Sequence, residues 1–68
     1  MISYNPFYET LNKRGISEYY LIKVEKISAH TLHRMKLGEP ITTKTTDKLC
    51  EILECNVEDI IKHELDEY

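Results

Sequence analysis

Residues 16–38 read ISEYYLIKVEKISAHTLHRMKLG, and this stretch decides the fold. Ser17 is a typical N-cap for a helix over residues 18–25. Ser28 is a typical N-cap for a second helix over residues 29–37, which a glycine then ends. Two short helices that are joined by a turn of about four residues predict a helix-turn-helix.

The second of these helices has two distinct faces when its residues are placed at about 100° each. Leu32 and Met35 point toward the core, with Thr31 beside them. The opposite face carries Ala29, His30, His33, Arg34 and Leu37, and Lys36 lies on its flank. Small and polar side chains at the N-terminal end, followed one turn later by an arginine, suit a helix that enters a DNA major groove N-terminus first.

The rest of the chain predicts three further helices and no strand. One covers residues 6–14 after the N-cap Asn5, the fourth begins after Thr42 or Thr43, and the last begins after Asn56. The inward positions of the fourth helix are Leu49, Cys50, Ile52 and Leu53. No segment shows the period-2 alternation of a strand, so we expect an all-α fold of five helices.

The length of 68 residues predicts a single domain over residues 1–68, with the motif at about residues 17–37. No apolar run approaches the roughly 18 residues of a membrane span, and no signal peptide begins the chain, so we expect a soluble cytoplasmic protein. Two cysteines are too few for the disulfide framework of a secreted mini-protein. A domain this small without such links depends on well-packed helices or on a partner subunit, which favours a dimer.

Charge is distributed unevenly along a chain whose net charge is −3. Residues 1–48 hold eight Lys and Arg against five acids, whereas residues 49–68 hold seven acids against Lys62. The basic part suits binding to a polyanion, because local charge decides such binding. The acidic tail suits a basic protein partner, and this alternative stays open.

A longer pattern links the motif to the second half of the chain. It runs Ile16-Ser17, Leu21, Ile27-Ser28-x-x-Thr31-Leu32-x-x-Met35-x-x-Gly38, and continues Leu49-Cys50-x-x-Leu53-x-Cys55-Asn56-Val57-Glu58-Asp59-Ile60-Ile61. This pattern resembles the phage lambda repressor/Cro superfamily of helix-turn-helix proteins, the XRE type, and especially its short single-domain members. The resemblance implies a five-helix lambda-repressor-like domain that binds double-stranded DNA through the helix over residues 29–37 and acts as a small transcriptional regulator, without a cofactor.

The resemblance also implies which residues contact DNA. It assigns Ser28 to the phosphate backbone, His33 to the groove margin, and Ala29, His30, Thr31 and Arg34 to base edges. Arg34 suits this role best, because its guanidinium can bond O6 and N7 of guanine together. Lys26 and Lys36 flank the helix and are expected to touch phosphates, which positions the protein without specifying sequence.

Two residues depart from the family pattern. Lys26 stands where a turn glycine is usual, and a left-handed backbone there costs a residue with a Cβ about 1–2 kcal/mol, so we expect a differently built turn. Glu18 stands where a neutral polar residue often braces a phosphate, and a carboxylate there repels DNA. Either Glu18 points elsewhere or binding is weak.

Other functions are poorly supported by the sequence. Cys50, Cys55 and the histidines match no standard zinc spacing, so we expect no metal site. Ser17 and Ser28 are explained as helix caps, and we expect no enzyme activity. The main alternative is a protein-interaction module on the same fold, of the antitoxin or antirepressor type, with little DNA binding.

The last predicted helix bears on oligomeric state. Ile61, Leu65 and Tyr68 recur at i, i+4 and i+7, which places them on one helix face. That face either packs on a second copy, giving a homodimer, or folds back on the first helix or the Met1-Ile2 arm. We expect self-association through these three residues.

Overall fold

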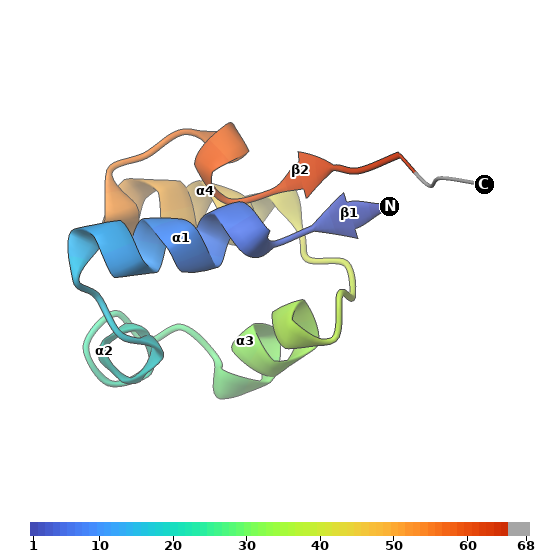
Figure 1. Ribbon diagram of the computed structural model, residues 1–68. Helices are drawn as coiled ribbons and strands as arrows, with labels where there is room; N and C mark the ends of the chain where they lie inside the picture. The colour runs from blue at the N-terminus through green and yellow to red at the C-terminus, as the bar shows by residue number, and fades with distance from the viewer. Residues whose placement is uncertain (66–68) are drawn as a thin grey trace.

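The computed structural model describes residues 1–65 and contains four α-helices, one 3₁₀ turn and a two-stranded sheet. The elements in order are β1 (Ile2–Ser3), α1 (Asn5–Arg14), α2 (Glu18–Lys23), α3 (Ala29–Lys36), α4 (Thr43–Leu53), η1 (Val57–Asp59) and β2 (Lys62–His63). In Figure 1, α1 lies in front of α4 and contacts it. Helices α2 and α3 lie on one side of this pair, and η1 lies on the other side. Within this part of the chain, no helix has the length and apolar character that crossing a bilayer requires.

The predicted helix starts of the motif are confirmed by hydroxyl caps. Ser17 Oγ accepts a hydrogen bond of 3.1 Å from the amide three residues on, and Ser28 Oγ accepts one of 3.1 Å from the amide two residues on. Thr42, one of the two candidates for α4, accepts a third such bond of 3.1 Å. Each cap satisfies an amide that the first helical turn leaves unpaired, so the helix starts follow from the local sequence.

One core joins all four helices. The predicted inward residues of the motif, Leu32 and Met35, are 3% and 2% exposed, and Leu49 and Leu53 of α4 are equally buried, whereas Cys50 and Ile52 are half-buried. The buried apolar residues among the described positions are Tyr4, Phe7, Leu11, Leu21, Ile27, Leu32, Met35, Leu49, Leu53 and Ile60. Burial of one face of α3 leaves its opposite face to solvent.

The fifth helix, predicted to begin after Asn56, is only the three-residue 3₁₀ helix η1, so the count of five α-helices is not confirmed. The 3₁₀ turn η1 is closed by the Asn56 N–H, which donates to the Asp59 carboxylate at 3.0 Å, and Ile60 then enters the core. The chain continues as β2, which pairs antiparallel with β1 and so joins the two ends of the chain. Strand pairing satisfies backbone groups that a fifth helix would otherwise have satisfied internally.

The predicted dimer stripe is therefore not a helix face. Ile61 is half-buried and packs against the core, and Leu65 is 83% exposed. Tyr68 lies outside the described residues. Of the two alternatives for this segment, the structure shows the fold-back on the N-terminal arm, since Glu64 N–H donates to the Met1 carbonyl at 2.8 Å.

The turn between α2 and α3 contains a residue in the left-handed conformation, at the position where the resemblance led us to expect glycine. Lys26 has a φ of 61°, so our expectation of a differently built turn is wrong. The amide of the next residue, Ile27, donates to the Leu21 carbonyl at 2.9 Å, and the Ile27 side chain is buried. The backbone bond and the buried side chain together hold Lys26 in this conformation despite its Cβ.

Replacing Lys26 with glycine is expected to raise the free energy of unfolding by about 1 kcal/mol, because glycine adopts a positive φ without the Cβ penalty. Lys26→Ala is the matched control, because it removes the charge and keeps the Cβ. Urea denaturation measures both variants. A glycine variant no more stable than the alanine variant would contradict the assigned strain.

Candidate nucleic-acid interface

The outer surface of α3 gathers most of the residues that the sequence predicted to contact DNA. Ser28, Ala29, His30, His33 and Lys36 are exposed, as is Lys26 in the preceding turn. Thr31 and Arg34 are half-buried. The predicted inward face with Leu32 and Met35 is confirmed, whereas Arg34 of the predicted outer face is half-buried. The eight predicted residues lie on α3 or just before it.

The N-terminal end of α3 can bind an anion. Ser28 Oγ uses a lone pair to accept from the His30 amide at 3.1 Å, which leaves the hydroxyl hydrogen free to donate. Amides of the first turn point out of the helix end, where the helix dipole is positive. Both features favour a phosphate at this position.

Glu18 faces the flank of α3. Its carboxylate lies 3.7 Å from Lys36 Nζ, and the Lys36 side chain remains 60% exposed. Burial raises the pKa of Tyr8, and the charge of Glu18 raises that pKa further, so Glu18 also acts on α1. An exposed ion pair contributes at most about 1 kcal/mol, so Lys36 can exchange this partner for a phosphate.

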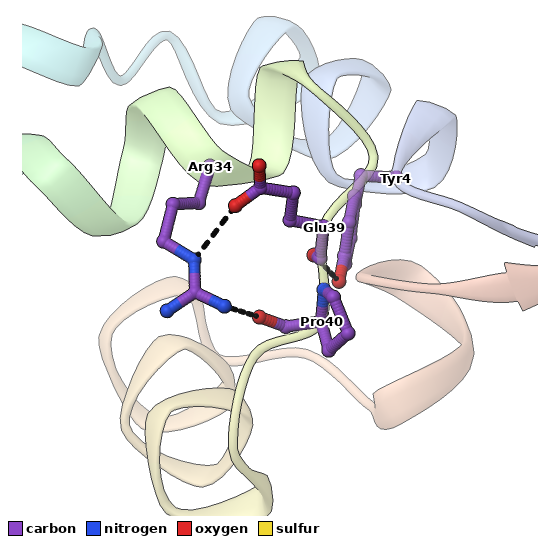
Figure 2. A network of polar contacts seen from close by, with 4 residues as sticks. All are labelled: Tyr4, Arg34, Glu39 and Pro40. Carbon is purple, nitrogen blue, oxygen red and sulfur yellow. Dashed lines mark hydrogen bonds and ion pairs between the residues drawn. The ribbon is translucent and has the colours of Figure 1, made fainter.

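Arg34 is tied to the loop after α3, as Figure 2 shows. Its Nε donates to Glu39 Oε2 at 3.1 Å, and its Nη2 donates to the Pro40 carbonyl at 3.1 Å. The Glu39 carbonyl in turn accepts from the Tyr4 hydroxyl at 2.6 Å. Neither Glu39 nor Tyr4 was predicted from the sequence to act near Arg34. The signal for Glu39 was its position five residues after Arg34, just past the glycine that ends the helix.

A hollow opens beside Arg34, between α3 and the start of α4. It has a volume of about 290 Å³ and is lined by Thr31, Arg34, Pro40, Ile41, Thr42 and Thr45. Thr31 and Arg34 therefore share one side of α3. The Arg34 side chain remains 42% exposed although its guanidinium makes two bonds.

The two cysteines lie at the other end of α4. Cys50 and Cys55 are free and half-buried, and the Cys55 amide donates to the Cys50 carbonyl at 3.0 Å. Burial raises the pKa of the Cys55 thiol to about 11 and also raises that of Cys50. Both thiols are therefore protonated at neutral pH, and a protonated thiol is a poor metal ligand. Within residues 1–65, no three His, Cys, Asp or Glu side chains are grouped to hold a metal ion.

Comparison with known proteins adds two similarities. Residues 9–66 match the family model of the Cro/C1-type HTH DNA-binding domain. The crystal structure of the transcriptional regulator VanUg, form II, is similar at a TM-score of 0.81 and 26% sequence identity, over 90% of this chain and 81% of that chain. No curated protein matches the sequence. The family match covers α2, α3 and the loop that holds Arg34.

Proposed function

The chain belongs to the Cro/C1-type helix-turn-helix DNA-binding domains, and we propose that it binds duplex DNA sequence-specifically, with α3 in the major groove, as a small transcriptional regulator. The observation that carries this proposal is the outer surface of α3, where small, polar and basic side chains stand exposed. The likeness to a transcriptional regulator supports the regulatory role. No catalytic step is part of this function.

The proposed contacts divide into two kinds. Ser28, the amides of the first turn of α3, Lys26 and Lys36 bind phosphates, and these contacts set the position of the helix on the duplex. Base edges are contacted by Ala29, His30, Thr31 and Arg34, with His33 at the groove margin. Arg34 donates two parallel hydrogen bonds to O6 and N7 of one guanine.

Electrostatics supports phosphate binding by this surface. The sequence of α3, AHTLHRMK, contains no acid. Two carboxylates from neighbouring segments form ion pairs with cations of α3, Glu18 with Lys36 and Glu39 with Arg34. These pairs partly neutralise both carboxylates, and salt at about 0.1 M weakens the repulsion from acids more than about 10 Å away.

Two-fold binding is a separate part of the proposal. A recognition helix of eight residues contacts few base pairs. Helix-turn-helix proteins that bind as dimers gain specificity because they contact two half-sites about one turn of DNA apart. Leu65, which is 83% exposed, remains a proposed contact between copies, whereas Ile61 packs against the core of its own chain.

The experiment that tests the function is selection of bound duplexes from a random DNA pool at moderate salt. The expected result is an enriched sequence that contains a G·C pair, and an inverted repeat with half-site centres about ten base pairs apart if two copies bind. No enrichment, with binding lost at modest salt, contradicts the proposal. That outcome favours the protein-interaction alternative, in which the acidic residues after α4 bind a basic partner.

Lys36→Ala is expected to weaken binding to the selected duplex and to a scrambled duplex by the same factor, because a phosphate contact is the same in every sequence. The slope of log affinity against log salt is expected to fall by about one. Lys62→Ala is the matched control, because Lys62 lies on β2 and pairs with Glu64. A selective loss on one duplex would show that Lys36 contacts a base.

A further inference from the structure

The guanidinium of Arg34 uses some of its N–H donors in hydrogen bonds within the protein and keeps others for a ligand. Its Nε and Nη2, which share an edge, donate to the Glu39 carboxylate and the Pro40 carbonyl (Figure 2). A guanidinium has five N–H donors in a rigid plane, so these two bonds leave three donors on Nη1 and Nη2. Within residues 1–65, both donors of Nη1 and one donor of Nη2 thus make no hydrogen bond, and one from each nitrogen can donate to a guanine.

The backbone of Glu39 is anchored on both sides. Its amide donates to the Arg34 carbonyl at 3.0 Å, which closes the turn at the end of α3. Its carbonyl accepts from the hydroxyl of Tyr4, which is 5% exposed and belongs to the core. Gly38, with a φ of 75°, allows the chain to make this turn. The backbone that carries the Glu39 carboxylate is consequently held in place by these two hydrogen bonds.

We propose that Glu39 is a positioning residue for base recognition, which holds Arg34 so that its Nη1/Nη2 edge faces the DNA. This inference rests on the proposed function. An arginine that is already held loses less rotamer freedom when it contacts a base than a free arginine does. Glu39 therefore increases the preference for guanine without touching the DNA.

The charge of Glu39 gives this role a distinctive signature. A carboxylate near the phosphates weakens binding to every duplex, whereas the hold on Arg34 favours only duplexes with the correct base. Removal of the side chain is therefore expected to lower discrimination without lowering general affinity. A residue with a merely structural role would change the stability of the protein and leave the ratio of affinities unchanged.

The test compares Glu39→Ala and Glu39→Gln with wild type on two duplexes: the one selected from the random pool, and the same duplex with the contacted G·C pair replaced by A·T. Glu39→Ala is expected to lower the ratio of affinities about 3- to 10-fold, the worth of one hydrogen bond, while affinity for the replaced duplex stays constant or rises. Glu39→Gln keeps an acceptor oxygen for Nε, so the ratio is expected to stay within about 2-fold and both affinities to rise.

The matched control is Glu51→Ala, which removes an exposed carboxylate from α4 and is expected to leave the ratio unchanged. Urea denaturation verifies that each variant is folded. A wild-type ratio in Glu39→Ala overturns this inference alone, as does an equal loss in Glu39→Gln. Equal affinity of the wild-type protein for the two duplexes overturns the proposed function and this inference with it.

Discussion

Replacing Phe7 with alanine is expected to lower the free energy of unfolding by about 3–5 kcal/mol, and so to unfold most of the protein at 25 °C. A core of this size supplies only about 3–5 kcal/mol of net stability, so one large cavity removes nearly all of it. Phe7 is fully buried in α1, and its ring packs edge-on against Tyr8 with centroids 5.1 Å apart. Far-UV circular dichroism and urea denaturation measure the loss.

Tyr19→Ala is the control for this prediction. Tyr19 is 70% exposed, with Lys23 Nζ 5.8 Å from its ring centroid. Loss of this exposed contact is expected to cost less than about 1 kcal/mol. A Phe7→Ala variant with the helical signal and urea midpoint of Tyr19→Ala would contradict the core assigned here.

Arg34→Ala is expected to have the largest effect on specificity. Loss of a two-bond contact with guanine lowers discrimination at one base pair by about 1–3 kcal/mol, or roughly 5- to 150-fold. Affinity for the selected duplex falls, whereas affinity for a duplex that lacks the guanine changes little. Fluorescence anisotropy titrations of the two labelled duplexes measure the ratio.

Lys36→Ala provides the comparison, because its loss is expected to be equal on both duplexes. Equal losses for Arg34→Ala would show that Arg34 binds a phosphate. The stability of Arg34→Ala is expected to remain within about 1 kcal/mol of wild type, since its ion pair with Glu39 is exposed on both sides.

Local signals in the sequence predicted the motif well. The serine and threonine caps lie within three residues of the amides they bind, so the starts of α2, α3 and α4 could be placed from sequence alone. Helical spacing placed Leu32 and Met35 in the core because one buried face is enough to orient a short helix.

The failures share a physical cause, which is that contacts in the folded protein decide the backbone against local preference. Strand β2 pairs with β1 from the opposite end, and strands of two residues are too short to show alternation. At Lys26, the buried side chain and backbone bond of its neighbour Ile27 outweigh the preference against a positive φ. Local propensity is a weak guide where tertiary contacts decide the backbone.

The candidate site shows the same division. Which residues lie on the outer face of α3 followed from its sequence. The hydrogen bonds that position Arg34 did not follow from the sequence, because they depend on the path of the chain after Gly38. They also depend on the Tyr4 hydroxyl, which donates to a carbonyl 35 residues away along the chain. A predicted contact residue can thus be placed by spacing, whereas its orientation needs the fold.

The most direct test of DNA recognition by α3 replaces the contacted guanine of the selected duplex with 7-deazaguanine, which lacks the N7 acceptor in the major groove. Wild-type affinity is expected to fall about 10-fold, because one charged hydrogen bond is lost. Arg34→Ala, which does not make that bond, is expected to bind both duplexes equally. A fall of the same size in both proteins, or none in the wild type, would contradict recognition of this guanine by Arg34 of α3.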